Sequence, residues 1–112
     1  MVRLLFLLGL LFSLNAVAAG NGTVSGYIKT VQIKESGYLL IQFEENHANP
    51  TECLQPSMVA IKPDSKVFDQ IFSIALAAHL SHRKANFYTV LPCSEQYSTS
   101  YPVGITGAIL DQ

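Results

Sequence analysis

The segment PDSKVFDQIFSIALAAHLSHRK, residues 63–84, contains the helix around which the rest of the fold is arranged. Its apolar residues fall on one arc when the segment is projected at about 100° per residue, namely Val67, Phe68, Ile71, Phe72, Ile74, Ala75 and Ala78. Pro63 ends the preceding element, and Asp64 or Ser65 can act as the N-cap. The pattern therefore predicts a helix from Lys66 to about Arg83.

Three strands are predicted before this helix. Residues 23–33 are rich in β-branched side chains, but the apolar positions change parity between Ile28 and Val31. Such a change predicts a bulge or a sharp coil, which lets one strand serve two sheet faces. Residues 38–45 form the second strand, joined to the first by a turn at residues 35–37. Residues 57–62 form a short third strand.

Two strands are predicted after the helix. Residues 87–91 form the fourth strand, which Pro92 and Cys93 end. Residues 94–102 are polar and are interpreted as a loop. Residues 103–110 form the fifth strand, with Val103, Ile105 and Ile109 on one face.

The resulting order, β-β-β-α-β-β, matches the OB-fold, a five-stranded Greek-key barrel. We therefore predict a mainly β, OB-fold-like five-stranded barrel with one helix between strands 3 and 4 and with one disulfide. The apolar arc of the helix would cover the open end of this barrel. Another small α+β sandwich with the same order of elements is the alternative.

The first residues have the pattern of a secretory signal peptide. Arg3 supplies a positive charge, an apolar run of about 11 residues follows it, and small residues surround Ala19 and Gly20. The apolar run is shorter than the roughly 20 residues that cross a bilayer; a buried N-terminal helix is the alternative. We expect residues 1–19 to be a signal peptide and residues 20–112 to be one OB-like domain. The mature protein would be secreted or periplasmic, without a membrane span.

The charge of the mature chain disfavours nucleic acid as a partner. Removing Arg3 from the seven Lys and Arg residues leaves six against eight Asp and Glu residues, a net charge of −2 with neutral histidines. Domains that bind nucleic acid usually carry a basic excess that neutralises phosphates. We therefore expect no nucleic-acid binding.

Cys53 and Cys93 are the two cysteines of the chain. In an oxidising compartment, a pair without metal-type spacing predicts one disulfide. Closing a loop of about 41 residues would stabilise the fold by roughly 4 kcal/mol. Two buried free thiols or a redox pair are the alternatives, although neither cysteine belongs to a C-x-x-C motif.

The segment 94–101 between the last two strands is the candidate ligand site. OB-folds bind ligands with the strand 2–3 face and with the loops that join strands 1–2 and 4–5. In this segment two tyrosines flank three hydroxyl residues, a composition that suits stacking on a sugar ring and hydrogen bonding to its hydroxyls. The candidate ligand-binding residues are Tyr97, Ser98, Thr99, Ser100, Tyr101 and, beside the 1–2 turn, Tyr38. The alternative is a solvated loop whose tyrosines pack back onto the barrel.

Enzyme chemistry, metals and cofactors are not indicated. Both cysteines are assigned to the disulfide, and the sequence contains no glycine-flanked serine elbow and no phosphate-binding glycine loop. His79 and His82 share a helix face without an evident third metal ligand. Three glutamates and a histidine near the second loop are more typical of a solvated surface than of a cation site. They are Glu44, Glu45, His47 and Glu52. We expect no catalytic residues, no metal and no cofactor.

The helix and its flanking cysteines resemble a known family. The stretch IFSIALAAH, residues 71–79, followed by a short strand ending in Cys93, resembles the subtilase cytotoxin type of bacterial AB5 toxin B subunits. The similarity covers most of the mature chain as a pattern: strand pair, cysteine, strand, Leu/Ala-rich helix, strand, cysteine, strand. The resemblance implies a ring-forming, glycan-binding subunit.

Two functions follow from these observations. The first is an exported, non-enzymatic binding module that recognises glycan or a similar polar ligand. The second is a protein-interaction or structural subunit of a cell-envelope assembly, or a homo-oligomer. It rests on apolar residues opposite the expected core face, namely Tyr38, Leu40, Tyr88 and Val90.

Overall fold

The computed structural model describes residues 19–46, 48–96 and 98–110. The expected signal peptide lies outside this part of the chain except for Ala19, and two residues discussed above, His47 and Tyr97, also lie outside it. Within the described ranges, no helix has the length and apolar character that crossing a membrane requires.

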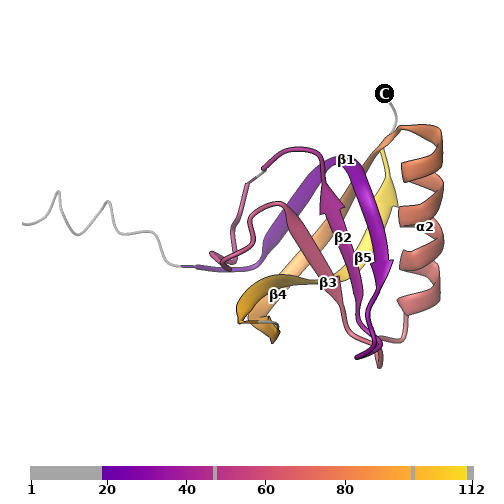
Figure 1. Ribbon diagram of the computed structural model, residues 1–112. Coiled ribbons are helices and arrows are strands. Elements are labelled where there is room, and N and C mark those ends of the chain that lie inside the picture. Colours follow the sequence, from indigo (N-terminus) through magenta and orange to yellow (C-terminus); the bar gives the residue numbers. More distant parts are fainter. Residues whose placement is uncertain (1–18, 47, 97, 111–112) are drawn as a thin grey trace, which may run out of the picture.

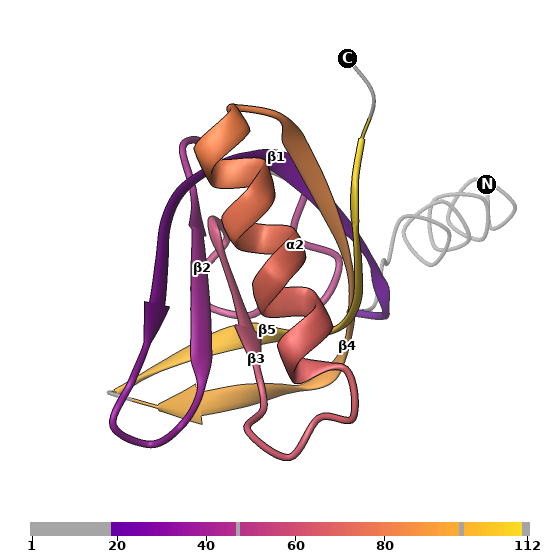
Figure 2. The ribbon, with the colours of Figure 1, turned by 90° about the vertical axis from the view of Figure 1, so that its right-hand side faces the viewer.

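The described part of the chain is mainly β, with five strands in one sheet and one helix, in the predicted order (Figure 1). The elements are β1 (Gly22–Ile33), β2 (Leu39–Phe43), β3 (Met58–Ile61), α2 (Phe68–Ser81), β4 (Lys84–Gln96) and β5 (Thr99–Ile109). Figure 2 shows α2 lying along one side of the strands.

The sheet has the order β1-β2-β3-β5-β4, and β4 pairs with β1, so the sheet closes on itself. β1 makes this closure possible because its two halves pair with different strands. Gly22 to Tyr27 pair with β4, whereas Ile28 to Ile33 pair with β2. The register shifts between Ile28 and Thr30, which confirms the bulge predicted from the change of parity.

The helix α2 packs its predicted apolar face into the core. Ile71, Ala75 and Ala78 are buried within the main apolar cluster, which also includes residues of β1 to β4. The expected N-cap is wrong, because the helix begins at Phe68 with Val67 as its N-cap and without a side-chain capping bond. Ser65 lies two residues before this N-cap, where its Oγ accepts a bond from the Val67 N–H at 3.4 Å.

A second, smaller apolar cluster lies on the opposite face of β2 and β3. It consists of Leu40, Ala60 and Tyr101, with Tyr38 and Met58 packed against it. In Figure 2 the paired ends of β4 and β5 cross behind β2 and β3, on the side away from α2. The β4–β5 hairpin therefore covers a sheet face that would otherwise be exposed.

The fourth and fifth strands are longer than predicted. β4 continues through Pro92 and Cys93, and residues 99–102 belong to β5 rather than to a loop. Pro92 is tolerated because the register shifts between Val90 and Ser94, where the missing N–H breaks no regular pairing. The fifth strand also does not place its apolar residues on one face as expected, since Val103 is buried but Ile105 is 42% exposed.

Candidate functional site

A surface hollow of about 360 Å³ lies beside the end of the β4–β5 hairpin. We call it the hairpin hollow; its described lining consists of Leu54, Glu95, Gln96, Ser98, Thr99 and Ser100. The pairs Ser94–Tyr101, Glu95–Ser100 and Gln96–Thr99 extend the hairpin to this point. Ser98 adopts a left-handed conformation, with φ of 63°, as the chain passes into β5.

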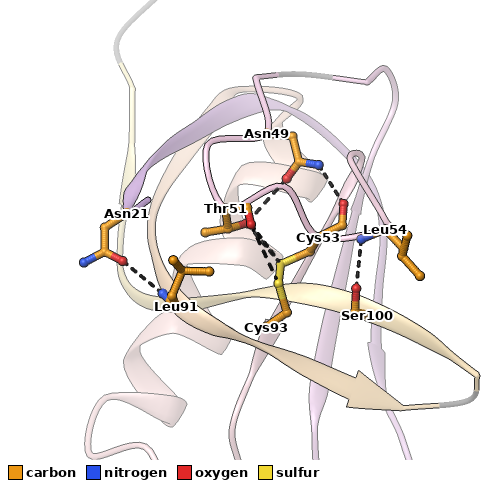
Figure 3. The surroundings of a disulfide bond; sticks show 8 residues. All are labelled: Asn21, Asn49, Thr51, Cys53, Leu54, Leu91, Cys93 and Ser100. Atoms are coloured by element: carbon orange, nitrogen blue, oxygen red, sulfur yellow. Dashed lines mark hydrogen bonds between the residues drawn. A yellow bond between two sulfur atoms is a disulfide. The ribbon is translucent and has the colours of Figure 1, made fainter. Parts of the chain in front are cut away.

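The disulfide anchors the loop that carries Leu54, one of the lining residues. Cys53 and Cys93 are bonded, as predicted, and join the loop before β3 to the second half of β4 (Figure 3). The Oγ1 of buried Thr51 lies 3.1 Å from Sγ of Cys53, where the hydroxyl is the group that can donate. The Asn49 side-chain amide donates to the Cys53 carbonyl oxygen at 2.7 Å. The loop that delivers Leu54 is therefore held both covalently and by hydrogen bonds.

Three further hydrogen bonds attach this loop to β5. The Leu54 N–H donates to Oγ of Ser100 at 2.9 Å, and the Gln55 N–H donates to the Ser100 carbonyl oxygen at 3.0 Å. The Gln55 side-chain amide donates to Oγ1 of Thr99 at 3.0 Å. These bonds place the exposed Leu54 side chain beside two hydroxyl residues that lie 45 and 46 positions later in the chain.

The turn between β1 and β2 reaches the same end of the hairpin. The Ser36 hydroxyl donates to Oε1 of Gln96 at 3.4 Å, and the Gln96 amide nitrogen donates to Oγ of Ser94 at 2.9 Å. The loops 1–2 and 4–5, which were expected to act together, are therefore in contact. Figure 2 shows this turn next to the hairpin end.

The candidate residues named from the sequence have different positions in the structure. Ser98, Thr99 and Ser100 line the hairpin hollow together, as a shared site requires. Tyr101 is only 6% exposed and packs on Leu40 and Ala60, so burial argues against the expected stacking of its ring on a ligand. Tyr38 is half-buried against the same cluster, and Tyr97 lies outside the described residues.

Three lining residues were missed as site residues. Glu95 and Gln96 lie in the predicted loop, but the composition that indicated a site was that of its tyrosines and hydroxyl residues. Leu54 comes from a distant loop, and a signal for it exists in the sequence. Since Leu54 follows Cys53 directly, the disulfide to Cys93 brings it next to β4.

The other candidate clusters do not form a metal site in the described part of the chain. Nowhere in these ranges do three or more His, Cys, Asp or Glu side chains gather as metal ligands would. Nδ1 of His79 lies 3.0 Å from the Ile28 carbonyl oxygen, whereas the His82 ring stacks on Tyr27 with ring centroids 4.5 Å apart. The two histidines thus serve different contacts.

A second hollow of about 240 Å³ lies near the end of the helix. It is lined by Ser25, Gly26, Tyr27, Glu44, Glu45 and Lys84. Its aromatic ring already has partners, because His82 stacks on Tyr27 and the Lys84 ammonium lies 5.6 Å from the ring centroid. Glu44 and Glu45 contribute to this hollow, but Glu52, which was grouped with them in the sequence, does not line it.

The hairpin hollow combines groups suited to an uncharged polar ligand. It offers hydroxyls, a side-chain amide, one carboxylate and an apolar side chain. Polar groups that fix orientation beside an apolar surface are characteristic of small-molecule sites. No protein-family model, curated protein or solved structure matches the chain.

Proposed function

We propose that this protein is an exported, non-enzymatic binding module that recognises a glycan in the hairpin hollow. The observation that carries the proposal is the convergence of Ser98, Thr99 and Ser100 with Leu54 around one hollow of about 360 Å³. Sugars are bound by hydrogen bonds to their hydroxyls together with contact between an apolar surface and the sugar ring. The disulfide supports export, because such bonds persist in oxidising compartments.

The architecture is an OB-fold barrel in this proposal. Three features support that assignment: the strand order β1-β2-β3-β5-β4, the pairing of a long bent β1 with both β2 and β4, and a helix between β3 and β4. Proteins of this fold bind oligosaccharides and oligonucleotides with the loops 1–2 and 4–5. Contact between Ser36 and Gln96 brings those two loops together here.

The make-up of the hollow favours binding over catalysis. Glycoside hydrolysis usually needs two carboxyl groups on either side of the scissile bond. Among the described lining residues, Glu95 is the one carboxylate. The combination of an exported OB-like domain, one disulfide and a sugar site resembles the B subunits of bacterial AB5 toxins, and we include ring formation by identical copies in the proposal.

A second function, protein interaction, is favoured by apolar residues that stay exposed on β4 and β5. Tyr88, Leu91 and Ile105 are 40%, 41% and 42% exposed. In contrast, the β4–β5 hairpin covers Leu40 within the same chain. Leu40 therefore belongs to the core and not to the expected partner surface. The exposed group could bind an envelope protein without any glycan.

A glycan array probed with the purified, oxidised protein tests the proposal, with light scattering on the same sample. We expect selective retention by an oligomer. Combining Leu54→Ala with Glu95→Ala should abolish retention with little change in melting temperature, because both side chains are exposed. The matched control, Leu80→Ala with Glu45→Ala, removes exposed residues of the same types elsewhere and should retain binding. A monomer without array binding would contradict the glycan proposal and favour the protein partner.

A further inference from the structure

The hydroxyl groups of Thr99 and Ser100 in the hairpin hollow have defined roles as hydrogen-bond acceptors toward the protein. Oγ of Ser100 accepts a bond from the Leu54 N–H, and Oγ1 of Thr99 accepts one from the Gln55 side chain. A hydroxyl has one hydrogen to donate in addition to its acceptor sites. Because both hydroxyls already act as acceptors toward the protein, each still has its hydrogen for a ligand. The hollow therefore presents two donors suited to a carbonyl or hydroxyl oxygen.

Glu95 adds a hydrogen-bond acceptor beside the two hydroxyl donors. Its side chain is exposed, and it is the one ionisable residue in the described lining of the hollow. No donor from the described residues bonds to its carboxylate. A carboxylate accepts hydrogen bonds only, so Glu95 favours a ligand N–H or O–H and repels a ligand carboxylate.

Leu54 supplies the apolar part of the hollow. Its side chain is 71% exposed although its backbone is fixed by the disulfide at Cys53 and by the bond to Ser100. Because the backbone is already fixed, no further loop ordering has to be supplied when a ligand covers this side chain. Leu54 is thus positioned to contact a methyl group or the apolar face of a sugar ring.

We propose that the hairpin hollow selects uncharged N-acetylhexosamine units, an inference that rests on glycan binding as the function of the site. The acetamido group matches all three parts of the hollow. Its carbonyl oxygen accepts from the Thr99 and Ser100 hydroxyls, its N–H donates to Glu95, and its methyl group covers Leu54. A plain hexose lacks the amide and the methyl group, and an acidic sugar places its carboxylate near Glu95.

Isothermal titration calorimetry on the oxidised protein tests this selectivity with four probes. The probes are the trimer of β-linked N-acetylglucosamine, methyl N-acetylgalactosaminide, a β-linked glucose trimer and sialyllactose, which carries both an acetamido group and a carboxylate. We expect at least one uncharged N-acetyl probe to bind about tenfold more tightly than the glucose trimer. A pocket that contacts a methyl group and an amide typically binds a ligand that lacks them about tenfold more weakly. Sialyllactose should bind more weakly than the uncharged N-acetyl probes.

Two variants separate the contributions of the side chains. Leu54→Ala should weaken binding of the N-acetyl probes several-fold and weaken binding of the glucose trimer less, because the glucose trimer has no methyl group to cover Leu54. Glu95→Gln keeps a hydrogen-bond acceptor but removes the negative charge. The variant should therefore reduce the difference in affinity between sialyllactose and the uncharged N-acetyl probes. Leu80→Ala and Glu45→Gln are the matched controls, and neither should alter any of the affinities.

The outcomes distinguish this inference from the function on which it rests. Preferred binding of the glucose trimer or of sialyllactose would overturn the N-acetylhexosamine inference and leave glycan recognition standing. A Leu54→Ala variant that loses all probes equally would also overturn it. Absence of binding to every probe, together with an empty glycan array, would overturn both.

Discussion

Gly104 lies where β5 crosses the buried side of β3. A Cβ atom at this position would stand 2.8 Å from Cδ1 of Ile61 and 2.8 Å from Cγ1 of Val59. Both side chains are fully buried in the main apolar cluster, so neither can move aside without disturbing its neighbours. The absence of a side chain at Gly104 therefore allows the close approach of β3 and β5, which pair in parallel at Ala60 and Val103.

Substituting Gly104→Ala should destabilise the protein by about 1–3 kcal/mol, the usual cost of overpacking a close-packed core. The matched control is Gly20→Ala, because no atom lies within 4 Å of a Cβ at Gly20. Urea unfolding of both variants measures the difference. A Gly104→Ala variant as stable as the control would show that Ile61 and Val59 can repack.

At the scale of the element, helix α2 ends in an unusual way. His82, its C-cap, has φ of 52° in the left-handed region that normally favours glycine. The conformation is supported by backbone bonds from the His82 N–H to His79 and from the Arg83 N–H to Ala78. It also directs the His82 ring onto Tyr27 of β1. The stacked pair thus joins the helix end to the strand against which it packs.

Two substitutions at this position separate the ring contact from the backbone strain. His82→Ala and His82→Gly both remove the stacking on Tyr27. Only alanine keeps a Cβ in the left-handed conformation, which costs about 1 kcal/mol. We expect His82→Ala to be less stable than His82→Gly by about that amount in chemical unfolding. Equal stability of the two variants would mean that the chain leaves the left-handed conformation once the ring is gone.

At the scale of the whole molecule, the disulfide connects folding with the proposed site. It joins the loop that carries Leu54 to β4, and that loop bonds to Thr99 and Ser100 of β5. Small domains bury limited apolar surface and often need such cross-links. The bond therefore stabilises the fold and holds Leu54 beside the β4 and β5 residues that line the hairpin hollow.

Replacing both cysteines, Cys53→Ala with Cys93→Ala, should lower the free energy of unfolding by about 4 kcal/mol, because the unfolded chain regains the entropy of the open loop. Unfolding in guanidinium chloride measures this loss. The reduced wild-type protein should show nearly the same loss as the double variant. A loss below about 1 kcal/mol would mean that the hydrogen bonds of the loop suffice to hold it.

Local patterns in the sequence determined the order of elements, the bulge in β1, the buried face of α2 and the pairing of Cys53 with Cys93. The first three depend on residues that are near one another in the chain. The disulfide follows because the chain has two cysteines, so each has one possible partner. The extent of β4 and β5 depends on pairing between strands instead, since each residue added to one strand is stabilised by the other. Pro92 and a run of polar residues therefore indicated a loop where the two strands continue to pair.

The positions of individual side chains at the site were decided by the tertiary structure. Tyr101 is buried because the hairpin folds over β2 and β3, where Ala60 is small and Leu40 supplies an apolar surface. Leu54 reaches the hollow because a cross-link and three hydrogen bonds connect segments 40 or more positions apart. The sequence by itself determined the order of the strands and the helix and which cysteines bond. Only the packing of distant segments decided which side chains line the hairpin hollow, because burial depends on what covers a residue and not on its own chemistry.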